Sequence, residues 1–292
     1  MPPTPLPPPP SEPEWPIPTL NLRVEDLAHP GAVLFFKHIP NPVEALKGAI
    51  TNVFKLLYAS VDKAPTNVES ILLVLRPMEG VAYTTDGTEC TKEIHFSLQH
   101  VVNSQKRCKD EIMGVLTHEL VHCFQYNAKD TCPSGLIEGI ADWVRLHSNL
   151  VPPHWKRIPG AKWDAGYEKT GYFLEWIDRR YGKTKGKEEK GAIVRVLNET
   201  MKECEYEEEK IWVDLVGLPV TALWECYCDE MKEKEEIEKV LETNESSETV
   251  LKQAEKANKR DRAQSVDLES DASLDAVVVF GTSEEAQPPV VK

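Results

Sequence analysis

Two histidines and a glutamate near the middle of the chain have a spacing suited to metal chemistry. The run His-Glu-Leu-Val-His from His118 to His122 has the HExxH pattern. On an α-helix, residues four apart lie on one face, so both imidazoles can bind one ion while Glu119 points into the same cleft. The pattern therefore predicts His118 and His122 as ligands of Zn²⁺, and Glu119 as the general base that activates a metal-bound water.

An acidic motif further along the chain can complete this site. Glu138 follows His122 by sixteen residues and opens the run Glu-Gly-Ile-Ala-Asp, which ends at Asp142. A glutamate oxygen can serve as the third zinc ligand and leave the fourth position to water. Asp142 lies one helical turn beyond Glu138, where it can accept the free ring N–H of a ligand histidine. We therefore predict Glu138 as a metal ligand and Asp142 as a residue that orients a ligand histidine.

Other classes of metal site make different demands on these positions. Metzincins need a glycine and a histidine three and six residues after the second histidine, where this chain has Gln125 and Ala128. The metzincin class is therefore excluded. An aspzincin-like site remains open, in which Asp142 is the third ligand and Glu138 has a structural role.

Two helices must position these residues. Asp110 and Glu111 favour a helix N-terminus just before the HExxH run, because negative charge stabilises that end. A second helical pattern, from about Leu136 to Asn149, carries the acidic motif. Apolar residues that can bury the other flank of the first helix are Ile112, Met113, Leu116, Leu120 and Phe124.

The part of the chain before these helices has a mixed pattern. Apolar residues from Val43 to Leu57 recur at helical spacing, whereas Ala32 to Phe36 and Ser70 to Leu75 are short apolar runs typical of strands. From Asp110 onward the periodicity is mainly helical. We predict an α+β, zincin-like fold with a small mixed sheet in the N-terminal half, an HExxH helix and a mainly helical C-terminal half.

A hairpin is predicted within that sheet. Val81 to Thr85 and Glu93 to Ser97 flank an Asp86-Gly87 turn signal. We expect Glu93 to Ser97 to form the sheet edge on which an extended peptide lies.

The ordered series of motifs resembles the plant basic secretory proteins and their fungal and bacterial relatives. The resemblance covers roughly Leu20 to Tyr227 and implies a gluzincin-type zinc metallopeptidase that acts on peptides or proteins. The Glu-x-x-x-Asp spacing after HExxH is also that of thermolysin-like gluzincins. The matching runs are His118 to Asn127, Gly135 to Leu146, Trp163 to Thr170, Tyr172 to Leu174, Val196 to Asn198 and Leu223 to Trp224.

The resemblance also implies a donor for the oxyanion that forms when a peptide carbonyl is attacked. Tyr167, within the Trp163 to Thr170 segment, is the first candidate, and Tyr172 is the second. His95 and His147 come next. His147 and His154 have no spacing that ties them to the metal motif, and we expect both to be surface or core residues.

Charge and composition exclude other functions. The formal net charge is -14, and residues Asp229 to Lys292 hold 17 acidic and 9 basic residues. Without a basic stripe, a nucleic-acid partner is not expected. Apolar runs such as Ile71 to Leu75 are too short to cross a membrane. We predict a Pro-rich disordered leader over residues 1–18, a peptidase domain over 19–228, and a charged helical extension with a disordered tail over 229–292.

The leader also bears on location. It contains ten prolines and no lysine or arginine, so it lacks the pattern of a secretory signal. This predicts a cytoplasmic protein, whereas the family resemblance implies a secreted one. The seven cysteines include no CxxC pair, and we expect reduced thiols. A partner of the leader cannot be named from the sequence.

Two functional hypotheses from different classes follow. The first is a zinc-dependent peptidase with Glu119 as general base. The second is a catalytically silent, zinc-stabilised binding or adaptor protein. Glu119 favours the enzyme, since a purely structural metal site needs no base.

Overall fold

The computed structural model describes residues 14–184, 187–188 and 191–241. The described residues up to Glu233 belong to one compact unit. The predicted Pro-rich leader lies outside the described residues as far as Pro13. The predicted C-terminal extension and tail lie outside them from residue 242 onward.

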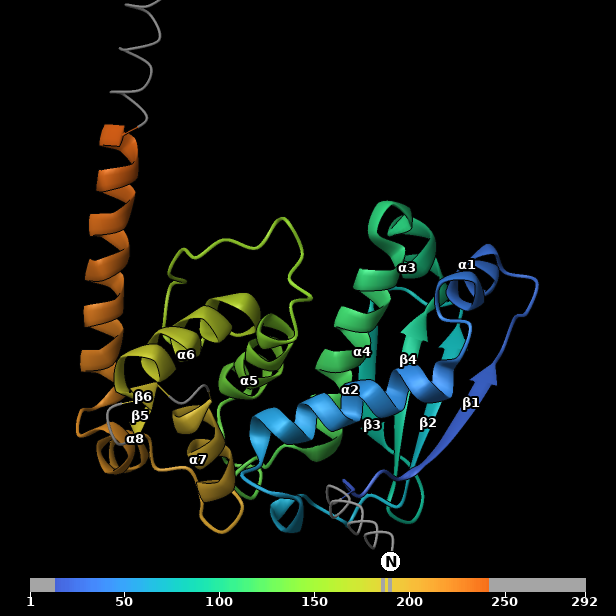
Figure 1. The fold of residues 1–292 in the computed structure, drawn as a ribbon, viewed down its shortest axis with the longest axis horizontal. Coiled ribbons are helices and arrows are strands. Elements are labelled where there is room, and N and C mark those ends of the chain that lie inside the picture. The colour runs from blue at the N-terminus through green and yellow to red at the C-terminus, as the bar shows by residue number, and fades with distance from the viewer. Residues whose placement is uncertain (1–13, 185–186, 189–190, 242–292) are drawn as a thin grey trace, which may run out of the picture. The chain divides into compact units, whose positions relative to one another are not determined.

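A four-stranded mixed sheet lies on the right of Figure 1, and its strands come from the N-terminal part of this unit. Its order is β1 (Thr19–Val24), β2 (Ser70–Arg76), β4 (Thr91–Ser97) and β3 (Ala82–Asp86). The first three strands are parallel, and β3 is antiparallel to β4. The predicted small mixed sheet and its hairpin are therefore confirmed.

The prediction of the sheet edge is wrong. Glu93–Ser97 lies in β4, which pairs with β2 on one side and β3 on the other. The edge near the HExxH helix is instead β3. The parallel pairing of β2 with β4 depends on contacts distant in sequence, and the hairpin pattern alone does not reveal it.

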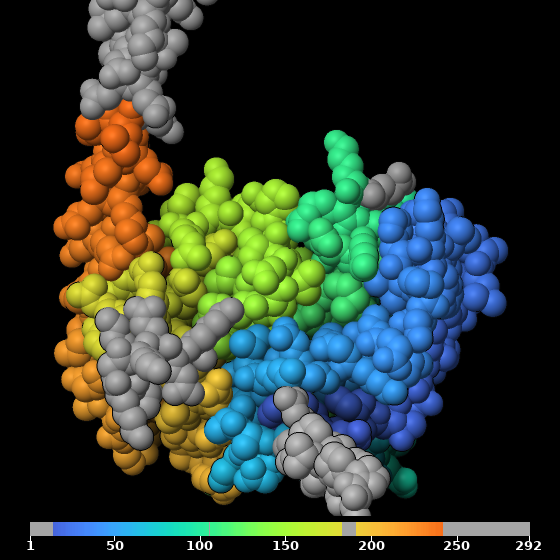
Figure 2. Space-filling model, viewed as in Figure 1, coloured from blue at the N-terminus to red at the C-terminus, as the bar shows by residue number. Residues whose placement is uncertain are grey.

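Helices cover the sheet. They are α1 (Pro30–His38), α2 (Pro42–Leu57), α3 (Leu98–Asn103) and α4 (Cys108–Phe124). Short 3₁₀ turns occur at Val61–Lys63 and Gln105–Arg107. In Figure 2, α2 forms a blue band across the middle of one face. Asn41 caps α2 by accepting a hydrogen bond from the Glu44 N–H at 3.2 Å.

Ala32–Phe36 was predicted as a strand and instead lies within α1. Pro30 occupies the start of the helix, and His29 Nδ1 accepts a hydrogen bond from the Gly31 N–H at 3.0 Å. These are helix-start signals, and a five-residue apolar run cannot distinguish a strand from a buried helix segment. Phe35 is fully buried and meets Phe96 of β4 edge-on.

The C-terminal half is mainly helical, as predicted. It contains α5 (Ser134–His147), α6 (Tyr167–Tyr181), α7 (Ala192–Thr200), α8 (Glu208–Val216) and the helix Val220–Leu241. A short two-stranded ribbon pairs Lys183–Thr184 with Lys187–Glu188. Trp143, Phe173 and Trp176 are fully buried here and form part of the hydrophobic core.

Helix α4 joins the two halves, since it contacts β3 and α2 on one side and α5 on the other (Figure 1). Twelve of its 17 residues are buried. Its buried polar side chains, among them His118 and Glu119, therefore need hydrogen-bond partners.

Two general findings concern helices and cysteines. Among the described residues, no single helix has the length and apolar character to span a membrane. Glu208–Val216 and Val220–Leu241 meet that test only together, across a 67° bend.

All seven cysteines are described, and each is free.

Candidate active site

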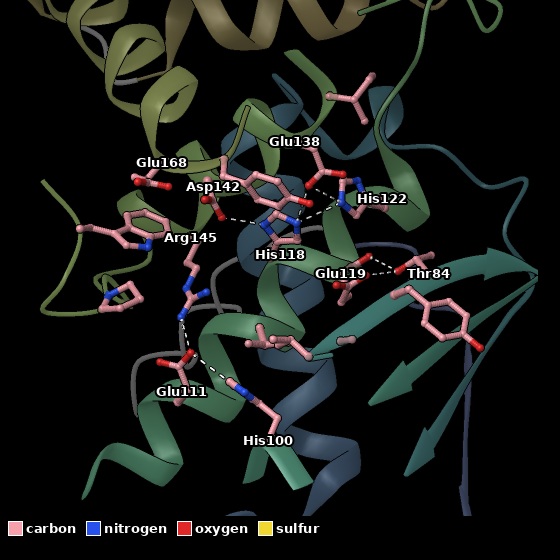
Figure 3. A pocket seen from close by; sticks show the side chains of 18 of the residues that line it. Thr84, His100, Glu111, His118, Glu119, His122, Glu138, Asp142, Arg145 and Glu168 are labelled. Carbon is pink, nitrogen blue, oxygen red and sulfur yellow. Dashed lines mark hydrogen bonds and ion pairs between the residues drawn. The ribbon is translucent and has the colours of Figure 1, made fainter. Parts of the chain in front are cut away.

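Three side chains from two facing helices converge on one point (Figure 3). His118 and His122 lie one turn apart on α4, and Glu138 faces them from α5. His118 Nε2 is 3.1 Å from His122 Nε2 and 3.1 Å from Glu138 Oε2. His122 Nε2 is 3.7 Å from the same carboxylate oxygen. Since these three ligand atoms all lie within 4.8 Å of one another, this group can hold a metal ion.

Asp142 supports His118 from the opposite side of the ring. The Nδ1–H of His118 donates to Asp142 Oδ1 at 2.7 Å, and Asp142 is almost completely buried. Burial opposes protonation of His118, but the hydrogen bonds to Asp142 and Glu138 outweigh it and raise its pKa to about 9. The same negative charges attract a cation. Because Asp142 is bound to Nδ1, it does not face the point where both Nε2 atoms meet, so the geometry favours Glu138 over Asp142 as third ligand.

The surroundings of Glu138 favour its charged, carboxylate form. Burial alone would raise the pKa of Glu138. The hydrogen bonds with His118 and His122 have the larger effect and lower this pKa to about 2. A carboxylate that keeps its charge at every pH near neutrality is suited to bind a cation.

Gln125 is a partner of the site that sequence reasoning did not identify. Its Nε2 lies 2.6 Å from His122 Nδ1, while its Oε1 is buried and has no hydrogen-bond partner among the described residues. The alternative amide orientation, with Oε1 facing Nδ1, lets Oε1 accept the Nδ1–H and gives that oxygen its missing partner. It also leaves the Nε2 lone pair of His122 for a metal. Gln125 directly follows the end of α4, so its role depends on the backbone turn and has no sequence signal.

Glu119 is positioned by the edge strand. The Thr84 hydroxyl on β3 lies 2.8 Å from Glu119 Oε2 and 3.0 Å from the Glu119 carbonyl oxygen, so it can donate to either. Glu119 is buried yet lines the cavity, as Figure 3 shows. The carboxylate is thus held beside the metal-ligand group and remains accessible from the cavity.

Tyr167 lies over the ligand group. Its ring is stacked on that of His118 with 6.0 Å between centroids. The negative charge of Glu138 is the main reason that the pKa of Tyr167 is raised, so the phenol keeps its proton. Tyr167 has a φ of 46°, in the left-handed region, which is costly for a bulky residue and often occurs at functional sites.

Close packing holds the Tyr167 segment in place. Thr170 Oγ1 accepts from the Gly166 N–H and donates to the Trp163 carbonyl, both at 2.9 Å. A Cβ at Gly139 would lie 2.3 Å from Thr170 Cγ2, so α5 needs glycine there. Glu138 therefore supplies the carboxylate of the site, and the adjacent Gly139 leaves room for the segment that carries Tyr167.

The other candidate donors lie elsewhere. Tyr172 is buried against Trp155 and under the guanidinium of Arg157, and it does not line the cavity. His95 stacks on Tyr83 of β3, and His147 packs edge-on against Trp143. The structure therefore brings only Tyr167, among these predicted donors, to the ligand group.

A cavity of about 730 Å³ opens onto the site. It runs between β3 and α4 on one side and α5 with the start of α6 on the other, and His154 also lines it. At this volume it is in the size range of small-molecule and peptide sites.

Comparison with known proteins identifies the family of the chain. A family model described as "Peptidase of plants and bacteria" matches residues 17–227. No curated protein and no solved structure gives a significant match. The matched range contains His118, His122 and Glu138, and it agrees with the predicted extent from Leu20 to Tyr227. The chain therefore belongs to the basic secretory protein family of plant and bacterial peptidases.

Proposed function

We propose that the chain is a zinc-dependent peptidase of the gluzincin type with a zincin-like active site. The observation that carries this proposal is the convergence of His118, His122 and Glu138 beside Glu119 in one cavity. The match to a family of peptidases and the metal-binding geometry support this proposal independently of each other.

The ligand distances fit zinc. Zinc–nitrogen and zinc–oxygen bonds of about 2.0 to 2.2 Å in a tetrahedron separate neighbouring ligand atoms by about 3.4 Å. The three separations here are 3.1, 3.1 and 3.7 Å. Two imidazoles and one carboxylate also match the ligand set of zinc peptidases, in which water takes the fourth position.

Glu119 has the position of the general base. A zinc ion held by His118, His122 and Glu138 would lower the pKa of its water to about 7 and polarise the substrate carbonyl. Glu119 accepts the proton of the attacking water and passes it to the leaving amine. The hydroxyl of Thr84 lies 2.8 Å from Glu119 Oε2, and a hydrogen bond donated to that oxygen orients the carboxylate.

Tyr167 is the proposed oxyanion donor. Its stacking on His118 keeps it beside the ligand group, and a phenol hydroxyl is protonated at neutral pH and able to donate. A donor aimed at charge that develops in the transition state is expected to speed the reaction about 10² to 10³ fold.

The substrate is proposed to lie along β3. This strand is the sheet edge beside α4, and Val81 to Thr84 line the cavity. An extended peptide can add to a free edge by main-chain hydrogen bonds. A protein or peptide chain is therefore the substrate class.

Elemental analysis paired with a peptide-library digest tests the proposal. We expect about one zinc per chain, loss of metal in His118→Ala and His122→Ala, and cleavage that a chelator stops. Glu119→Gln should keep zinc while turnover falls by about 10² to 10⁴, because it removes the base but no ligand. Unchanged metal in both histidine variants, or full turnover in Glu119→Gln, contradicts the proposal.

A further inference from the structure

The cavity extends beyond the metal-ligand group to an ion pair that the proposed reaction does not use. Arg145 Nη2 donates to Glu111 Oε1 at 3.3 Å, and both residues line the cavity (Figure 3). Arg145 Nε also donates to the Leu150 carbonyl at 3.1 Å. His100 Nε2 lies 3.5 Å from the same Glu111 oxygen.

The ion pair lies at a defined distance along the two helices. Glu111 precedes His118 by seven residues on α4, and Arg145 follows Glu138 by seven residues on α5. Seven residues rise about 10 Å along a helix, which is the length of about three residues of extended peptide. A substrate that reaches the metal-ligand group can therefore reach Arg145 as well.

Arg145 is held rigidly. Its side chain is 9% exposed, and its guanidinium carbon is 5.3 Å from the ring centroid of Trp155. A Cβ at Gly114 would lie 2.6 Å from Arg145 Nε, so glycine on α4 makes room for the guanidinium. An arginine fixed in this way loses little entropy when it binds a further group.

Part of its hydrogen-bonding capacity is unused. A guanidinium has five N–H donors, and two are accounted for by Glu111 and Leu150. Among the described residues, none accepts a hydrogen bond from Nη1. The only Lys or Arg side chain among the described residues that line the cavity is Arg145, whereas acidic side chains line it at Glu111, Glu119, Glu138, Asp142 and Glu168.

We propose that Arg145 binds a carboxylate of the substrate, about two to three residues from the bond that is cleaved. This inference rests on the proposed peptidase function. The carboxylate is either the C-terminus of a short peptide or an acidic side chain. Arginine suits both, since its planar N–H groups match the two carboxylate oxygens. The surrounding acidic side chains disfavour an anion at other points of the cavity and so fix the register of the peptide.

Matched peptides test this on the zinc-loaded wild-type protein. One pair differs only in a free or amidated C-terminus, and the other pair, both amidated, differs only in Glu or Gln near the cleaved bond. One of the two carboxylates should raise kcat/KM about 10 to 100 fold over its amide. The pair that responds identifies the source. Equal rates within both pairs overturn the proposal, while cleavage of the amides leaves the peptidase function intact.

A binding assay separates the two proposals. The same peptides are titrated into zinc-loaded Glu119→Gln protein by calorimetry. If no peptide is cleaved by the wild type, the peptidase function fails, and binding alone decides the Arg145 proposal. A preference for the carboxylate of at least about tenfold supports it, and equal affinity within each pair overturns it.

A substitution at the arginine gives a second test. Arg145→Lys keeps the charge but loses the planar fork, so the ratio of rates for the carboxylate and amide peptides should fall about tenfold. The ratio is measured within one preparation, so partial unfolding cancels. Arg157→Lys is the matched control, since Arg157 packs on Tyr172 and does not line the cavity. A ratio that is unchanged in Arg145→Lys overturns the proposal.

Discussion

Helices α4 and α5 build one site in different ways. Helix α4 is buried on nearly all sides, and its five-residue HExxH run supplies two possible ligands and the possible base. Helix α5 is likewise buried, continuously from Gly139 to Arg145, and it supplies Glu138 and Asp142. The groups on α4 are brought together by helix geometry alone, whereas those on α5 reach the site only because the two helices pack together. The α5 contribution is therefore the one that tertiary structure controls.

The largest effect should come from removing the α5 ligand. Glu138→Ala leaves only the two histidines, so zinc content should fall from about one per chain to nearly none. Asp142→Ala keeps all three ligands and should weaken zinc binding by about 10 to 100 fold. Elemental analysis after dialysis and chelator competition measure both effects. If Asp142→Ala lost more metal than Glu138→Ala, the aspzincin-like assignment would replace ours.

The next largest effect concerns the segment that α5 holds over the site. Tyr167→Phe removes one hydroxyl and keeps the ring that stacks on His118. Turnover should fall by about 10² to 10³ with little change in KM or thermal stability. Tyr172→Phe is the control, since it removes the same atom from a tyrosine outside the cavity. Equal, small effects in both variants would show that Tyr167 packs without donating.

The comparison also explains what the sequence can predict. The residues on α4 follow from a local pattern, and the helical pattern from about Leu136 to Asn149 predicts the second helix, which α5 confirms. Most strands and the long α2 helix follow from apolar periodicity. The predicted strand at Ala32–Phe36 failed because its length suits either element, and the packing of Phe35 on Phe96 settles it as helix.

The remaining contacts depend on packing between distant segments. Thr84 reaches Glu119 only because β3 is the sheet edge, which follows from the parallel pairing of β2 and β4. Arg145 meets Glu111 only because α4 and α5 lie side by side. No spacing in the sequence encodes either contact.

A smaller effect on zinc affinity is expected at Gln125, which directly follows the end of α4. If its Oε1 accepts the Nδ1–H of His122, then Gln125→Met removes that acceptor at similar size, and zinc affinity should fall about 10 to 100 fold. Gln125→Glu keeps an acceptor and should retain most of the affinity. Chelator competition measures both. Equal zinc affinity in wild type and Gln125→Met would show that His122 needs no partner at Nδ1.

The last effect is on stability, not on zinc or turnover, and concerns the ion pair at the far end of the cavity. The hydrogen bond with His100 is the main reason that the pKa of Glu111 is lowered to about 2; burial opposes this shift, and the charge of Arg145 adds to it. Because the folded-state pKa lies below the unfolded value of 4.5, the charged form stabilises the fold above about pH 4.5, and this stabilisation is lost as pH falls towards 2. The shift corresponds to about 3 kcal/mol at neutral pH. Glu111→Gln should therefore lower the free energy of unfolding by up to about 3 kcal/mol at pH 7, and by about half as much at pH 3. Urea unfolding at the two pH values measures this, with the exposed Glu225→Gln as control. An equal loss at both pH values would mean that Glu111 stabilises the fold by packing, not by its charge.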